Sequence, residues 1–78
     1  MPVLRLFAAA REAAGTARDH VSGETVEQVL HNAVERYGDT FAAVLTTSRV
    51  WVNGDEVGSS APVGEDDEVA VLPPVSGG

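Results

Sequence analysis

The chain has 78 residues and a formal net charge of −7 at pH 7, which is enough for one small domain with a modest core. A chain of this size cannot enclose a deep substrate cavity, so its length favours a carrier, subunit or adaptor over a self-sufficient enzyme. The absence of cysteine excludes disulfides and thiolate metal sites, and the acidic balance argues against a nucleic-acid partner, which requires a basic surface.

The first predicted element is a strand, Val3–Ala9, because this run is apolar apart from a single charge. We expect residues 10–17 to form a loop closed by Gly15. Ala17–Ser22 alternates weakly and is predicted to pair back on the first strand as a hairpin partner.

The clearest helix begins at Thr25. Thr25 and Gln28 have the spacing of a capping box, in which each side chain reaches the other's backbone N–H. Gly38 stands where a left-handed residue would end the helix, and residues 40–47 are expected to add a short helical turn. The apolar stripe of the main helix consists of Val26, Val29, Leu30, Ala33, Val34 and Tyr37.

Three more strands are predicted in the second half of the chain. Arg49–Asn53 is rich in β-branched and aromatic residues, and Asn53-Gly54 favours a tight turn into a short return strand at residues 55–57. Glu68–Leu72 predicts the last strand. Pro73 ends it because proline has no N–H to donate to a neighbouring strand.

About five strands and one main helix indicate the α+β class, with a single sheet and the helix packed on one face. No internal repeat divides the chain. We expect residues 1–72 to form one domain and residues 73–78 to form a flexible tail that ends in Gly-Gly.

Four stretches, spread along the whole chain, carry a family resemblance and occur in the order that the family has. They are FAAAREAAG from Phe7 to Gly15, TVEQVL, VNGDEV, and EDDEVAVLPPVSGG. Together they resemble the MoaD family, the small subunits of molybdopterin synthase, within the ubiquitin-like β-grasp sulfur carriers. The double proline before a glycine pair is the most specific element. The resemblance implies a β-grasp fold in which the first and last strands run parallel at the centre of a mixed sheet.

The resemblance also implies a role for the end of the chain. Gly78 would be adenylated by a ubiquitin-activating-type partner that uses ATP, and would then become a thiocarboxylate. Inside the active site of the molybdopterin synthase large subunit it would donate sulfur to cyclic pyranopterin monophosphate, giving molybdopterin. The chain would be the non-catalytic subunit of a hetero-oligomer and would bind no cofactor itself.

The residue types of the tail suit this chemistry. A terminal carboxylate with an ordinary pKa of ~3.3–3.7 is ionised at neutral pH and can attack the α-phosphate of ATP, and glycine has no Cβ to block attack on the activated carbonyl. Six extended residues reach about 20 Å, and the double proline stiffens the root of the tail. The residues expected to thread into the partner ahead of Gly78 are Pro73, Pro74, Val75, Ser76 and Gly77.

Alternation along the strands separates an inner from an outer face. The expected inner positions are Leu4, Leu6, Ala8, Val50, Val52, Val69 and Val71. Phe7, Trp51 and Leu72 take outer positions, and they form one apolar patch if their three strands are neighbours. With arginines at its rim, this patch is expected to be a partner interface. The alternative is that Trp51 merely covers a thin core.

Arg11 lies in the segment expected to emerge near the tail, since the first and last strands would be parallel. It could pair with a partner carboxylate or guide the tail, and the alternative is a solvated loop arginine. His20 and His31 have no ligand-spaced companions, so no metal site is expected. No apolar run approaches the ~20 residues of a membrane span, and we expect a soluble cytoplasmic protein without a membrane partner.

Two other functions stay open. One keeps the carrier chemistry but places it in thiamine, cysteine or tRNA thiolation. The other is a ubiquitin-like modifier whose Gly78 forms isopeptide bonds with other proteins, because conjugation uses the same activated carboxylate. The double proline favours the molybdopterin pathway over the other carrier pathways.

Overall fold

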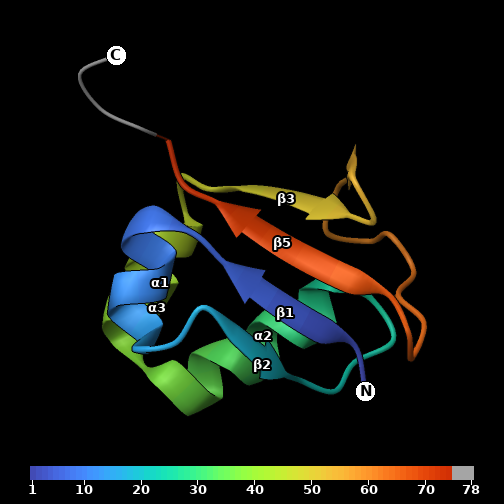
Figure 1. Cartoon of the computed structure of the whole chain (residues 1–78), viewed down its shortest axis with the longest axis horizontal. Coiled ribbons are helices and arrows are strands. Elements are labelled where there is room, and N and C mark those ends of the chain that lie inside the picture. The colour runs from blue at the N-terminus through green and yellow to red at the C-terminus, as the bar shows by residue number, and fades with distance from the viewer. Residues whose placement is uncertain (75–78) are drawn as a thin grey trace.

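A computed structural model describes residues 1–74 of the chain, which form a five-stranded sheet with helices on one side (Figure 1). The elements in chain order are β1 (Val3–Leu6), α1 (Ala8–Ala14), β2 (Arg18–His20), α2 (Val26–Tyr37), α3 (Asp39–Leu45), β3 (Arg49–Val52), β4 (Asp55–Glu56) and β5 (Glu68–Leu72). The strand order is β2-β1-β5-β3-β4. β1 and β5 are parallel at the centre, and the other neighbouring pairs are antiparallel. The expected α+β class and β-grasp topology are therefore confirmed.

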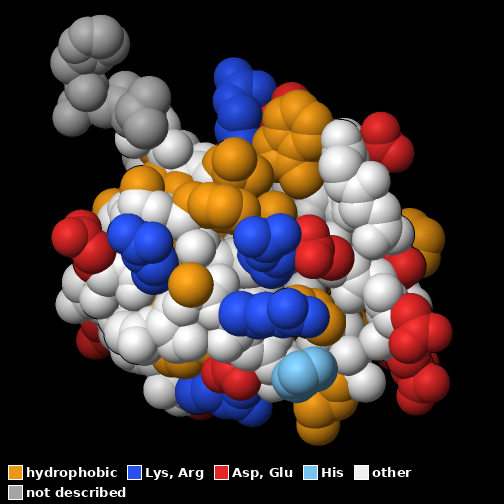
Figure 2. Space-filling view, viewed as in Figure 1, with side chains coloured by type: hydrophobic (Ala, Val, Ile, Leu, Met, Phe, Trp, Pro, Cys, Tyr) orange, Lys and Arg blue, Asp and Glu red, His pale blue; other side chains and the backbone are white. Residues whose placement is uncertain are grey.

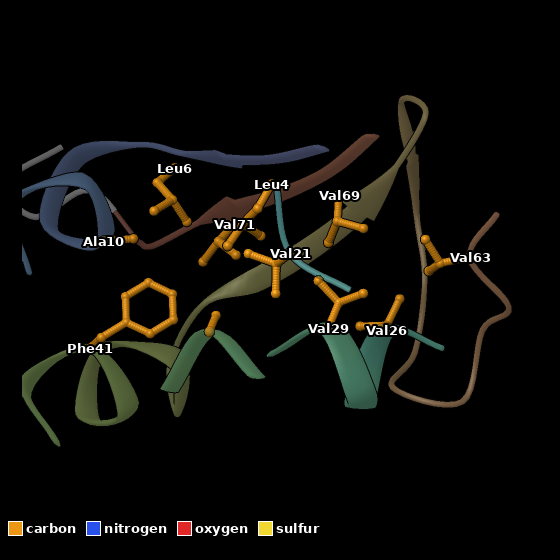
Figure 3. Packing of buried hydrophobic residues seen from close by; sticks show 11 residues of the cluster. Leu4, Leu6, Ala10, Val21, Val26, Val29, Phe41, Val63, Val69 and Val71 are labelled. Carbon is orange, nitrogen blue, oxygen red and sulfur yellow. The ribbon is translucent and has the colours of Figure 1, made fainter. Parts of the chain in front are cut away.

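The core lies between the sheet and the helices (Figure 3). The buried apolar residues are Leu4, Leu6, Ala10, Val21, Val26, Val29, Ala33, Phe41, Val63, Val69 and Val71. Phe41 of α3 is the largest fully buried side chain, and its ring meets that of Tyr37 edge to face, with 5.1 Å between centroids. At about 1.5–3 kcal/mol for each fully buried large aliphatic or aromatic side chain, this cluster is the main stabilising contribution to the fold.

The alternation predicted for the strands is confirmed with one exception. The inner residues of β1 and β5 are buried, and Val50 and Val52 of β3 are partly buried against the core. Ala8 was expected to continue the inner face of the first strand, but it is exposed and begins α1. Its φ of +50° turns the chain out of the strand direction, so the strand ends at Leu6 rather than at Ala9.

The prediction of a loop over residues 10–17 was wrong for most of that segment, because α1 occupies Ala8–Ala14. Five of its seven residues are alanine, the strongest helix former, and the other two are arginine and glutamate. Gly15 ends the helix at φ +77°, in the left-handed conformation that glycine adopts without strain, and donates its N–H to the carbonyl of Arg11 at 2.9 Å.

The main helix begins as predicted. Thr25 caps α2 by accepting a hydrogen bond from the backbone N–H of Gln28 at 3.2 Å. The second hydrogen bond differs from that of a capping box, because the Gln28 side chain accepts from the backbone N–H of Glu24 rather than from that of Thr25. Gly38 has a positive φ of +95°, but its ψ of −168° lies outside the left-handed helical region, because the chain extends there before it enters α3.

The predicted turn after β3 is confirmed, since Asn53 and Gly54 have φ values of +49° and +89° and lead into β4. Asn53 also fixes the start of β5. Its side chain accepts from the N–H of Glu68 and donates to Asp67, both at 2.9 Å. This link between β3 and β5 sets the register that the open face of the sheet depends on.

Candidate functional site

The candidate site is the face of the sheet that no helix covers. Outward residues of β5 and β3, with Phe7 just after β1 and Gly54 in the turn after β3, form a shallow groove of about 280 Å³. Its lining consists of Phe7, Trp51, Gly54, Glu68, Ala70 and Leu72. Figure 2 shows a patch of hydrophobic side chains on this face, with arginine side chains above and below it. The predicted neighbourhood of Phe7, Trp51 and Leu72 is therefore confirmed, and its role as a partner interface stays a prediction.

The strand register explains the shape of the groove. Trp51 of β3 lies directly opposite Ala70 of β5, so the smallest outward residue of the central strand stands beside the largest side chain of the face. Phe7 and Leu72 flank this position, and they are 38% and 37% exposed. Apart from Met1, they are the most exposed large hydrophobic residues among residues 1–74. Such apolar exposure is typical of a surface that binds another molecule.

Charged pairs border the groove. The Arg5 guanidinium lies 5.4 Å from the centroid of the Phe7 ring and 3.5 Å from the Glu68 carboxylate. Across the face, Arg49 forms a 2.8 Å ion pair with Glu56 of β4. Exposed pairs of this kind contribute little to stability, so their main effect is to fix the side chains around the apolar centre.

The root of the tail adjoins the groove. Leu72 is both the last residue of β5 and part of the groove lining. Pro73 and Pro74 follow, the first partly buried and the second exposed. Val75, Ser76, Gly77 and Gly78 lie outside the described residues, so their predicted roles in threading and sulfur transfer stay predictions.

Arg11 lies on α1 and not on the predicted loop. Because β1 and β5 are parallel, α1 begins at the end of the sheet where the chain leaves β5 (Figure 1). The Arg11 side chain is exposed and makes no ion pair or side-chain hydrogen bond within residues 1–74. Its placement fits a role near the tail, and that role stays a prediction.

The sequence-based reasoning missed two features of the site. Only the folded chain shows that Ala70 lies directly opposite Trp51 and that Glu68 forms an ion pair with Arg5. Nearby, the backbone N–H of Gly64 and the Asn53 side chain lower the pKa of Asp67, whose carboxylate shapes the turn before β5.

The described residues contain neither a metal-binding cluster nor a membrane-spanning helix. No group of three His, Asp or Glu side chains is arranged to hold a metal ion in the described part of the chain. In the same part, none of the helices combines the length and apolar character that crossing a bilayer requires.

A β-grasp sheet whose central strand leads toward a Gly-Gly tail defines a ubiquitin-like protein. Comparison with family models gives the family: the chain belongs to the ThiS family, whose model matches residues 4–78. It is a ubiquitin-like sulfur carrier of the ThiS–MoaD type. Among curated proteins, no sequence match was found.

Three solved structures show the extent of the similarity. The small archaeal modifier protein 1 of Methanosarcina acetivorans is 30% identical with a TM-score of 0.88, over 99% of this chain and 95% of that one. A chain in the Amycolatopsis orientalis BexX/CysO complex is 22% identical with a TM-score of 0.86, over 100% of both chains. A chain in the complex of subunits 1 and 2 of the Helicobacter pylori molybdopterin-converting factor is 17% identical with a TM-score of 0.72, over 99% and 97%. The last two show the fold alone.

Proposed function

We propose that this chain is the sulfur-carrier subunit of molybdopterin synthase and that Gly78 carries the sulfur. The observation that supports this most is the stretch from Glu65 to Gly78. Its strand is the central β5, which ends at Leu72 on the rim of the apolar groove. The double proline follows directly, and the glycine pair comes two residues later. A partner that covers the groove is therefore also placed to receive the tail.

The chemistry takes place in two steps on the carboxylate of Gly78. First, a carboxylate oxygen attacks the α-phosphate of ATP, which releases pyrophosphate and leaves an acyl-adenylate. Second, a sulfur nucleophile from a sulfide or persulfide donor attacks the acyl carbon and displaces AMP. Sulfide gives the thiocarboxylate directly, whereas a persulfide gives an acyl disulfide, whose S–S bond a thiol then reduces to release the thiocarboxylate. The product is a thiocarboxylate, which is ionised at neutral pH. The adenylating partner supplies the catalytic groups and this chain supplies the reacting carboxyl.

Two protein partners follow from this proposal, an adenylating enzyme of the ubiquitin-activating type and the large subunit of molybdopterin synthase. We propose that each docks on the groove formed by Phe7, Trp51 and Leu72 and takes the tail into its active site. The Amycolatopsis orientalis and Helicobacter pylori structures, each described as a complex, support hetero-oligomer formation.

Mass spectrometry tests the proposal directly. With its adenylating enzyme, ATP and a sulfur donor, the chain should gain the mass of one oxygen-to-sulfur exchange on the peptide that ends at Gly78. Addition of the large subunit and cyclic pyranopterin monophosphate should then yield molybdopterin and return the chain to its original mass. A thiocarboxylate that forms but gives no molybdopterin would redirect the carrier to thiamine, cysteine or tRNA thiolation.

A second candidate, a ubiquitin-like modifier, is favoured by the 30% identity to small archaeal modifier protein 1. In that function a lysine amine of a target protein attacks the adenylated carbonyl of Gly78, displaces AMP and forms an isopeptide bond. The chain has no lysine, so it could not extend itself into lysine-linked polymers. Peptides that carry the C-terminus of this chain on lysines of other proteins would favour this second candidate.

A further inference from the structure

Two arginines face each other across the edge of the sheet. In the antiparallel pairing of β1 and β2, Arg5 lies directly opposite Arg18. Directly opposite residues share a face and have Cβ atoms about 4.5–5.5 Å apart. Leu4, opposite Asp19, is buried, and Asp19 contacts Arg36 and Tyr37 of α2, so the alternate residues Arg5 and Arg18 point away from the helices. Both lie on the open face, next to the groove.

This arrangement is unfavourable for the isolated chain. Like charges directly opposite one another destabilise an antiparallel pair, and the chain has only five basic residues against twelve acidic ones. Asp19, the nearest acid in sequence, is turned to the other face and bound there. Arg5 is balanced by Glu68, whereas Arg18 makes no ion pair within residues 1–74. A locally unfavourable feature of this kind is expected where a surface serves binding.

The rest of the surface has the opposite charge. The open face carries Arg5, Arg18 and Arg49 with only Glu56 and Glu68, so ten of the twelve acidic residues lie elsewhere. Those on or beside the helices are Glu12, Glu24, Glu27, Glu35 and Asp39. A polyanion such as nucleic acid would be repelled by this chain as a whole, which favours a local carboxylate as the group that meets the arginine pair.

We infer that the Arg5–Arg18 pair binds acidic side chains of the protein that docks on the groove, and that it fixes the rotation of that partner about the groove. This inference rests on the proposed function, because it concerns the same docking event. An apolar patch alone does not determine how a partner is rotated on it, whereas charges at one side do. The arginine pair lies on the β2 side of the groove, and β3 lies on the other side. Only one orientation of the partner therefore places its acidic residues over the arginine pair and, at the same time, its tail-binding channel at Leu72.

Arg18 is the residue to test, because Arg5 also contacts Phe7 and Glu68. The variants are Arg18→Gln, Arg18→Lys and Thr40→Glu. The last is a matched control, since it makes the same change in net charge at an exposed position of α3. Association and dissociation rates with the adenylating enzyme and with the large subunit from the same genome are measured at low and high salt, together with thermal unfolding of each variant.

Arg18→Gln should weaken binding to at least one of the two partners about tenfold at low salt, as expected for loss of one charge-assisted contact, and should flatten the salt dependence. Arg18→Lys and Thr40→Glu should remain within about threefold of the wild-type chain. The unfolding midpoint of Arg18→Gln should not fall, because the substitution relieves a like-charge contact. Unchanged binding to both partners, or an equal loss in Thr40→Glu, overturns the inference.

The same samples separate this inference from the proposed function. In one outcome the wild-type chain and Arg18→Gln gain the thiocarboxylate mass equally fast at a limiting concentration of the adenylating enzyme, and both bind the large subunit equally well. In that case the arginine inference alone fails. If the wild-type chain binds both enzymes in a salt-dependent and Arg18-dependent way but never gains sulfur, the proposed function fails while the inference holds for a docking partner.

Discussion

Tyr37 donates a hydrogen bond from its hydroxyl to Asp19 Oδ2 at 2.5 Å, which joins the end of α2 to the edge strand β2. Arg36 donates to the same carboxylate oxygen and to the carbonyl of His20, both at 2.9 Å. Asp19 Oδ1 accepts from the N–H of His20 at 2.8 Å. Side chains of the chain itself thus bind the backbone of this edge strand, which protects it from pairing with another chain.

Acid should weaken this link. The hydroxyl of Tyr37 and then the guanidinium of Arg36 lower the pKa of Asp19 below its ordinary value of 3.8. A carboxyl with a lower pKa in the folded chain stabilises the fold above its unfolded pKa and loses that contribution as pH falls through the folded value. We predict that Asp19→Asn is less stable than wild type at neutral pH and that the difference shrinks with acid below pH 3.8. Urea unfolding at a series of pH values measures this, and a pH-independent difference would contradict it.

Alkali should affect the same contact through Tyr37. Burial, followed by the hydrogen bond to Asp19, raises the pKa of Tyr37 from 10.0 to about 12. The folded chain therefore holds this proton more tightly than the unfolded chain, so its contribution is complete below pH 10 and is lost as pH rises toward 12. The chain has one tyrosine, so its ionisation can be followed by phenolate absorbance. A midpoint at 10.0 would show that the contact is absent in solution, and Tyr37→Phe should remove this part of the alkaline destabilisation.

Gly23 should tolerate no side chain. A Cβ at this position would lie 2.6 Å from the backbone nitrogen of Val29 and 2.7 Å from its Cγ2, at a φ of +153°. We predict that Gly23→Ala lowers the free energy of unfolding by roughly 2–4 kcal/mol, through overpacking and an unfavourable backbone conformation. Gly58→Ala is the control, because a Cβ there meets nothing within 4 Å. Equal stability of the two variants in urea would show that the segment before α2 can move aside.

Much of the fold followed from local signals in the sequence. The strand Glu68–Leu72 was predicted with its observed bounds, because alternation begins after an acidic turn and a proline ends it. The main helix was predicted from the cap at Thr25 and the apolar stripe. α1 was missed because proximity to Gly15 favoured a loop, whereas the alanines of the segment have the stronger preference.

The sequence predicted which residues belong to the candidate site, but not which of them contact one another. Alternation alone placed Phe7, Trp51 and Leu72 outward, and the β-grasp topology brought their strands together. Which residues stand opposite one another depends on register, and register is set by contacts distant in sequence, such as Asn53 with Asp67. The pairing of Arg5 with Arg18 therefore became visible only in the folded chain.

Aromatic residues of the groove should matter more for binding than for stability. We predict that Phe7→Ala and Trp51→Ala each weaken binding to the large subunit or the adenylating enzyme by ~2 kcal/mol or more, as interface aromatics typically do. Phe7 is 38% exposed, so its loss should affect folding little. Phe41→Ala provides the contrast: Phe41 is fully buried and its loss should cost ~3–5 kcal/mol of unfolding free energy. Calorimetric binding and urea unfolding of the three variants measure both quantities. A core-sized stability loss in Phe7→Ala with unchanged affinity would assign Phe7 to the core.

The end of the tail should be essential for sulfur transfer and dispensable for folding. The described core is formed by residues between Leu4 and Val71, and Leu72 is the last residue of the sheet, so the fold is complete before Pro73. We predict that deletion of Gly78, or addition of one residue after it, abolishes molybdopterin formation and leaves the thermal unfolding midpoint unchanged. Deletion removes the glycine whose carboxyl is adenylated, and an added residue converts that carboxyl into an amide that cannot attack ATP. Thr40→Glu is the control, because it changes an exposed position of α3 and leaves the tail unaltered, and it should retain activity. Sulfur transfer by the extended chain, with mass spectrometry showing the added residue still present, would exclude Gly78 as the carrier of sulfur.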